Sequence, residues 1–191
     1  MNFVFKLVGA LAATTIMSVA QAATFDVYAS ANSSSGGTGL NTVSLLAGQS
    51  FSVTVSPTDL WNAGPLPRWS NADGLTGNLL ATGTDESGQA AGTLIGQNFG
   101  MYSQGGLSAA FGTLVGQIGS GNFFVVGTNY SGVAASTGVL KLFYWDSNRG
   151  DNSQFVTATV TAVPEAGQVS MALAGLAVVG AGAFLRQRRQ G

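Results

Sequence analysis

The chain has 191 residues, enough for one ordinary domain or two very small ones, and its 46% hydrophobic and 8% charged residues are an odd balance for a cytosolic protein. A formal net charge of −1 offers no basic surface to a phosphate backbone, so we do not expect nucleic-acid binding. The sequence contains neither Cys nor His, which removes disulfides, thiol nucleophiles and imidazole acid-base chemistry. Most familiar hydrolase mechanisms are thereby excluded, and we do not expect an enzyme.

The first 22 residues have the three parts of a secretory signal peptide. Residues 1–6 are short and positively charged, residues 7–19 are apolar, and Ala20-Gln21-Ala22 is a small-x-small cleavage site. We therefore expect export across the inner membrane, removal of residues 1–22 and a mature chain that begins at Ala23.

Residues 23–161 form the expected folded domain, with three basic and seven acidic residues and hence a net charge of −4. Residues 51–55 and 156–160 alternate apolar and polar positions, as half-buried strands do, and no helical periodicity competes with them. Short strands separated by Gly, Asn, Ser and Asp predict an all-β fold, an antiparallel β-sandwich of the jelly-roll or galactose-binding type or a barrel. The expected strands are 25–29, 43–46, 51–55, 114–118, 123–126, 139–145 and 155–160.

Gly-rich stretches at 83–92 and 100–106 are predicted to be loops that interrupt the sheets. Residues 29–39, with three successive serines and Gly36-Gly37, are either a wide loop after the first strand or a flexible leader.

Residues 142–155 contain the side chains that could bind a metal ion. An aromatic strand delivers Asp146, and a short polar loop then delivers Asp151 and Asn152. Two carboxylates and an amide oxygen on one tight loop are hard ligands that suit calcium, which takes about six to eight oxygens and tolerates loop geometry. The alternative is a polar turn in which Asp146 and Asn152 accept backbone N–H bonds.

Residues 166–185 are uncharged and mostly apolar, and lie between Glu165 and Arg186. A helix of about 20 residues spans the hydrocarbon core of a bilayer, so we expect a transmembrane helix here. The basic residues after it stay cytoplasmic by the positive-inside rule, which places the body on the other side of the membrane.

The C-terminal segment, residues 162–191, resembles the PEP-CTERM sorting signal of Gram-negative bacteria. A tripeptide, an apolar helix and a basic end follow one another in the family's order, although Ala166 stands where the family usually has a second Pro. The resemblance implies an exosortase-type membrane transpeptidase as partner, transient anchoring in the inner membrane, and release to the cell envelope or extracellular polysaccharide matrix. A plain tail anchor is the alternative. The sorting residues are Val163, Pro164, Glu165, Arg186, Arg188 and Arg189.

The body resembles the PA-IL-like galactose-binding calcium lectins in two segments, residues 63–69 and 142–155. In that family a carbonyl before a Gly-Pro segment, an Asp that ends the penultimate strand and an Asn-Asn-Ser triplet bind calcium, and the calcium binds sugar hydroxyls. The family's loop is longer than residues 147–150, and its sugar-contacting His has no counterpart. The implied calcium ligands are Ala63, Asp146, Asn148 or Arg149, Asp151 and Asn152.

Sugar binding would involve Asp146 and Asp151 through the calcium, with Trp61 and Trp69 as an aromatic wall or, alternatively, as core packing. Three function classes stay open: a calcium-binding and carbohydrate-binding surface protein, a purely structural matrix component, and an enzyme on exopolysaccharide.

Overall fold

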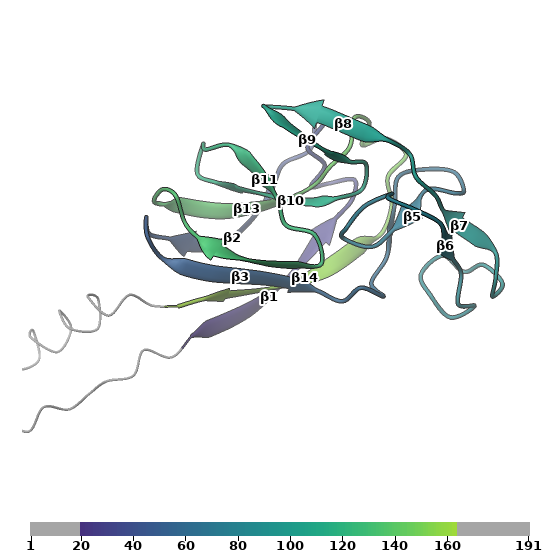
Figure 1. Cartoon of the computed structure of the whole chain (residues 1–191), viewed down its shortest axis with the longest axis horizontal. Helices are drawn as coiled ribbons and strands as arrows, with labels where there is room; N and C mark the ends of the chain where they lie inside the picture. Colours follow the sequence, from purple (N-terminus) through teal and green to yellow (C-terminus); the bar gives the residue numbers. More distant parts are fainter. Residues whose placement is uncertain (1–19, 164–191) are drawn as a thin grey trace, which may run out of the picture. The chain divides into compact units, whose positions relative to one another are not determined.

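The structure is a computed structural model that describes residues 20–163 (Figure 1). The expected transmembrane helix and basic tail, the sorting residues from Pro164 onward, and residues 1–19 of the expected signal peptide lie outside the described residues. Every strand pair between residues 20 and 163 is antiparallel, so the expectation of an all-β antiparallel fold is confirmed. The described part contains no helix with the length and hydropathy of a membrane span.

The strands of the two main sheets lie at the two ends of the described sequence. One sheet has the order β1-β14-β3-β12 and the other β11-β10-β13-β2, and the two form a sandwich around a shared core (Figure 1). Their bounds are β1 (Gln21–Tyr28), β2 (Leu40–Leu45), β3 (Ser50–Val55), β10 (Leu114–Ile118), β11 (Phe123–Val125), β12 (Asn129–Val133), β13 (Gly138–Tyr144) and β14 (Phe155–Ala162).

Strand β14 shows how the sequence pattern sets the core. Val156, Ala158 and Val160 are fully buried between the sheets, whereas Thr157 is only half-buried on the opposite face. The alternation expected for residues 156–160 is confirmed, because successive side chains of a strand point to opposite faces. A one-residue slip against β3, where Val160 pairs with Val53, would bring the threonines into the core.

Strand β13 carries large apolar side chains on both of its faces. Leu140, Leu142 and Tyr144 face the sandwich core, while Phe143 and the following Trp145 belong to a second cluster on the outer face. That cluster is covered by the hairpin of β8 (Met101–Gln104) and β9 (Leu107–Ala110), whose Tyr102 carbonyl accepts a 2.9 Å hydrogen bond from Trp145 Nε1. The hairpin therefore gives Trp145 both an apolar cover and a polar partner.

The segment between β3 and β10 forms three two-stranded ribbons: β4 (Trp61–Asn62) with β5 (Trp69–Ser70), β6 (Leu79–Leu80) with β7 (Leu94–Gly96), and β8 with β9. The prediction that residues 100–106 form a loop was wrong, because β8 occupies most of them. Strand β12 was also not predicted, since only Tyr130 of its side chains packs against the core. Residues 83–92 lie outside the strands, as expected.

Residues 29–39 form a tight loop rather than a flexible leader. Asn32 N donates to the Tyr28 carbonyl, and Ser34 N donates to the Tyr144 carbonyl at 2.8 Å. Ser33 is fully buried, and a side chain at Gly37 would lie 2.5 Å from the Ser33 carbonyl oxygen. The serine run is thus tied to the end of β13.

The two ends of the described chain are neighbours in one sheet, since Gln21 pairs with Ala162. Cleavage after Ala22 would remove two residues from β1 and leave six paired with β14. Val163 N donates to the Ser50 carbonyl, and the Val163 carbonyl accepts from Gln49 Nε2. The ordered pairing therefore extends up to Val163, the first of the expected sorting residues.

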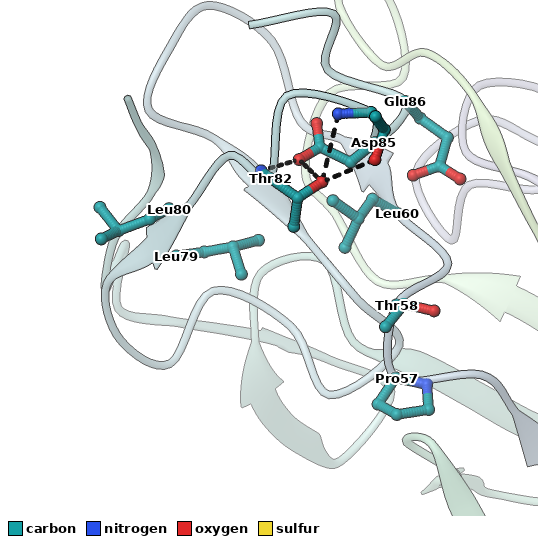
Figure 2. Close-up of a pocket in the computed structure, with 9 residues that line it drawn as sticks. Pro57, Thr58, Leu60, Leu79, Leu80, Thr82, Asp85 and Glu86 are labelled. Atoms are coloured by element: carbon teal, nitrogen blue, oxygen red, sulfur yellow. Dashed lines mark hydrogen bonds between the residues drawn. The ribbon is translucent and has the colours of Figure 1, made fainter. Parts of the chain in front are cut away.

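A pocket of about 420 Å³ lies beside the β6–β7 ribbon, lined by Leu60, Leu79 and Leu80 on its apolar side and by Asp85 and Glu86 on its polar side (Figure 2). Asp85 accepts hydrogen bonds from the backbone N–H and the hydroxyl of both Thr82 and Ser87. These bonds, the Ser87 hydroxyl first and then the Thr82 N–H, lower the pKa of Asp85 to about 2. The charged carboxylate closes the loop, and so low a pKa does not suit a general acid.

Replacing Asp85 by Asn is expected to weaken the acid dependence of stability. A lowered pKa stabilises the fold above the ordinary value near 3.8, and this contribution is lost as the pH falls through about 2. The free energy of unfolding of residues 23–163 should therefore fall less steeply from about pH 4 to pH 2 in the variant, as measured by urea denaturation. Identical slopes in the two proteins would contradict this role of Asp85.

Candidate functional site

The two segments expected to bind calcium meet in the folded chain. Asn62 and Ser153 form an isolated antiparallel bridge, in which each N–H donates to the other's carbonyl at 3.0 and 3.1 Å. Gly64 N donates to Asn62 Oδ1, and Ala63 N donates to the Arg68 carbonyl, which shapes the 63–68 loop. Residues 91 positions apart in sequence are thus held side by side by backbone pairing.

Asp146 lies two residues after the end of β13, and the serine loop fixes its backbone. Ser34 Oγ donates to the Asp146 carbonyl at 3.1 Å, and Asp146 N lies 3.2 Å from the same Oγ. The residue is only 4% exposed. Burial raises the pKa of the Asp146 carboxyl, opposed by hydrogen bonds from Asn152, Ser147 and the Asn148 backbone, and the charge of Asp151 adds to the rise.

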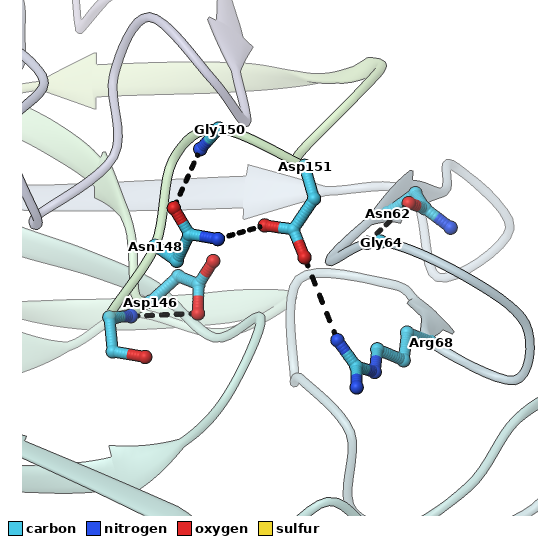
Figure 3. A network of polar contacts seen from close by, with 8 residues as sticks. Asn62, Gly64, Arg68, Asp146, Asn148, Gly150 and Asp151 are labelled. Carbon is cyan, nitrogen blue, oxygen red and sulfur yellow. Dashed lines mark hydrogen bonds and ion pairs between the residues drawn. The ribbon is translucent and has the colours of Figure 1, made fainter.

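Asp151 closes the loop against the 63–68 segment (Figure 3). Its Oδ1 accepts a 2.9 Å hydrogen bond from Asn148 Nδ2, and its Oδ2 lies 3.6 Å from Arg68 Nη1. An ideal Cβ built at Gly64 would stand 2.6 Å from that Oδ2, and the φ of +118° at Gly64 also disfavours any side chain. The carboxylate therefore lies directly against the Gly64 backbone.

Asn152 is the buried amide of the site, at 8% exposure. Its Nδ2 donates to the Ala29 carbonyl at 3.3 Å, but its Oδ1 has no hydrogen-bond partner among the described residues. A buried acceptor without a partner costs roughly 1–3 kcal/mol, so an unpaired Oδ1 calls for a ligand or for a structural explanation. The Tyr144 hydroxyl is also buried and has no partner among the described residues, and its pKa is raised by burial first and then by the charges of Asp146 and Asp151.

The other two expected ligands are engaged within the loop. Asn148 uses its side chain for Asp151 and for the N–H of Gly150, at 3.1 Å (Figure 3). The Arg149 carbonyl accepts a hydrogen bond from Ser30 Oγ at 3.1 Å. Within residues 20–163 no hydrogen bond or ion pair joins Arg149 to either carboxylate, and no three acidic, His or Cys side chains gather into a metal cage. The site therefore combines two carboxylates with neutral oxygens.

The burial of Trp61 decides between the two alternatives given for its ring, a wall against a sugar or core packing. Trp61 is fully buried, its Nε1 donates to the carbonyls of Asn71 and Gly112, and its ring packs edge-on against Tyr144 at 4.5 Å between centroids. This is the core-packing alternative. Trp69 is half-buried and packs against the small cluster around Ile95.

Three residues of the site were not found from the sequence. Ser34 positions Asp146, Arg68 pairs with Asp151, and Phe99 lies under Arg68, whose guanidinium carbon is 4.3 Å from the ring centroid. Phe99 is 43% exposed, so an aromatic surface reaches solvent beside the site. Arg68 could have been suspected from the sequence, because it is one of only three basic residues in residues 23–161, whereas nothing in the sequence distinguishes Phe99.

No protein-family model matches the sequence, and no curated protein matches it. Among solved structures, the fold is similar to that of the N-terminal domain of EclA, described as a PllA-like lectin. The TM-score is 0.44 at 19% sequence identity, over 74% of this chain and 95% of that one. The likeness is distant, so the function is inferred below from the site itself.

Proposed function

We propose that the chain is an exported surface protein whose β-sandwich binds calcium at the junction of the 63–68 and 146–153 loops and binds carbohydrate there. The observation that carries this proposal is the buried Oδ1 of Asn152, which has no hydrogen-bond partner among the described residues. Asn152 lies on the same loop as Asp146 and Asp151. A cation would supply that partner and would offset the burial of the Asp146 charge.

The residues fit calcium better than other metals. The donors would be the carboxylates of Asp146 and Asp151, the Asn152 amide oxygen and the Ala63 carbonyl, all hard oxygens of the kind calcium prefers. The Gly64 backbone leaves the space beside Asp151 free of a side chain. Calcium, when bound, would supply coordination to sugar hydroxyls, and Phe99 and Trp69 would supply a neighbouring aromatic surface.

A purely structural role is the second candidate, and a specific contact favours it. Both Asp151 oxygens already have partners, Asn148 Nδ2 and Arg68 Nη1. Arg68 in this role would neutralise the loop without a metal, and calcium ligation by Asp151 requires that these contacts give way.

Binding to a glycan array in calcium and in chelator tests the first candidate against the second. Residues 23–163 are expected to retain a subset of glycans in calcium, to lose them in chelator, and to lose them on Asp146→Ala. If no glycan is retained in either condition, the structural role is favoured. Retention through this site that does not depend on calcium would contradict the proposed calcium binding. Release of shorter saccharides from the array's polysaccharides would instead indicate an enzyme.

We also propose that the C-terminal segment is processed by an exosortase-type transpeptidase, on the strength of the motif order in residues 162–191. Changing Pro164 and Glu165 together to Ala should block processing while insertion proceeds, because the apolar segment 166–185, which is expected to drive insertion, is untouched. The mass of the chain recovered from the native host measures this. An unchanged mature mass would contradict the sorting-signal interpretation.

A further inference from the structure

A cleft other than the pocket beside the β6–β7 ribbon lies along the loop that carries Asp151 and Asn152. It has a volume of about 440 Å³, within the range of small-ligand sites, and lies between residues 28–31 and residues 149–154. Tyr28, Ser30, Arg149, Ser153 and Gln154 are among the residues that line it. None of the four proposed calcium donors does, so the cleft is separate from the proposed metal site.

Tyr28 gives the cleft an aromatic wall. The residue is at the end of β1 and is 49% exposed, although its ring packs at 5.0 Å between centroids on Phe155. The packing against Phe155 steadies the ring while leaving about half of the residue open to solvent. An exposed, steadied aromatic ring is a surface against which the apolar C–H face of a sugar packs.

Arg149 lines the cleft and brings a positive charge to it, and no carboxylate between residues 20 and 163 pairs with this charge. The ion pair found within residues 20–163 joins Arg68 to Asp151, and Asp151 does not line the cleft. Ser30 Oγ holds the Arg149 carbonyl at 3.1 Å and so joins the two walls. A guanidinium pairs with a carboxylate through two parallel hydrogen bonds, which favours an acidic ligand over a neutral one.

The backbone at Gln154 is held in an unfavourable conformation. Its φ is 67°, and it is the one residue other than glycine with a positive φ among residues 20–163. Its carbonyl accepts a 2.9 Å hydrogen bond from Ala29 N, and the residue is exposed and lines the cleft next to Ser153. Strained residues of this kind cluster at ligand sites, and an amide next to a hydroxyl suits the hydroxyls of a sugar.

We propose that this cleft binds a carboxylate-bearing residue of an acidic saccharide without calcium. Arg149 pairs with the carboxylate, Tyr28 packs against the sugar ring, and Gln154 and Ser153 bond its hydroxyls. The inference rests on the proposed carbohydrate-binding function and names its ligand class, but it uses a site that does not include the calcium donors. The net charge of −4 on the body gives a polyanion no general attraction, so binding must come from this local arrangement.

Titration of the full chain in detergent with a galacturonic acid trisaccharide, in the presence of chelator, tests the proposal. Binding should be saturable and at least tenfold tighter than for a galactose trisaccharide, and acetate alone should not compete. Arg149→Gln and Tyr28→Ala should each weaken binding at least tenfold, because each removes one of the main contacts. Lys141→Gln, a matched loss of charge outside the cleft, should bind like the unaltered chain.

Equal affinity for the acidic and the neutral trisaccharide, or equal binding by Arg149→Gln and Lys141→Gln, would overturn the proposal. Tyr28 and Arg149 are exposed, so their variants are expected to melt like the unaltered chain, which separates loss of the contact from loss of the fold. Asp146→Ala should leave this binding intact while abolishing any calcium-dependent retention of glycans. Failure of the calcium site and failure of the cleft are therefore distinguishable.

Discussion

Added calcium is expected to raise the melting temperature of residues 23–163. A ligand that binds only the folded state stabilises it by mass action, by about 2.7 kcal/mol at a hundredfold excess over the dissociation constant. For a domain of this size such a gain corresponds to an upward shift of several degrees, on the order of 5–10 °C. Thermal melting followed by circular dichroism, in calcium and in chelator, measures the shift.

Variants of the loop show whether the shift comes from the proposed site. Asp146→Ala and Asn152→Ala should each abolish it, because each removes a buried oxygen that the proposed ion would use. Asp26→Asn is the matched control, since Asp26 bonds Thr157 on the surface of the first sheet, away from the loop. Equal melting temperatures in calcium and chelator for the unaltered protein would remove the metal proposal.

Trp61→Ala is expected to reduce the free energy of unfolding by about 3–5 kcal/mol, the usual loss when a buried aromatic side chain is truncated. The change removes a fully buried ring, its edge-on contact with Tyr144, and the donor to the Asn71 and Gly112 carbonyls. Urea denaturation of residues 23–163 measures the loss.

Trp69→Ala is the matched control for this truncation. Trp69 is half-buried at the rim of a smaller cluster, so its truncation should lower the free energy of unfolding by less than half as much as Trp61→Ala. A loss below about 1 kcal/mol for Trp61→Ala would contradict its place in the core. Because Trp61 precedes the Asn62–Ser153 bridge, the same variant should also weaken the calcium response.

The all-β fold could be predicted from the sequence because its evidence is local. Alternation in 51–55 and 156–160 follows from the two faces of a strand, and β3 and β14 pair as neighbours in one sheet. The ribbons between β3 and β10 could not be predicted in this way. Their strands have two to four residues, too few for a period, and they are stabilised by contacts with distant segments, such as the Trp145 bond to Tyr102.

The candidate site also has one part that the sequence predicts and one part that only tertiary contacts decide. Sequence alone determined the polar loop, with Asp146 at the end of an aromatic strand and Asp151 and Asn152 after it, because residue types and their spacing are local. Only the tertiary structure decided that Trp61 is core, that Arg68 neutralises Asp151, and that Phe99 and the Tyr28 cleft flank the loop. Burial and charge pairing depend on which distant segments meet, and here the Asn62–Ser153 bridge and the serine loop bring them together.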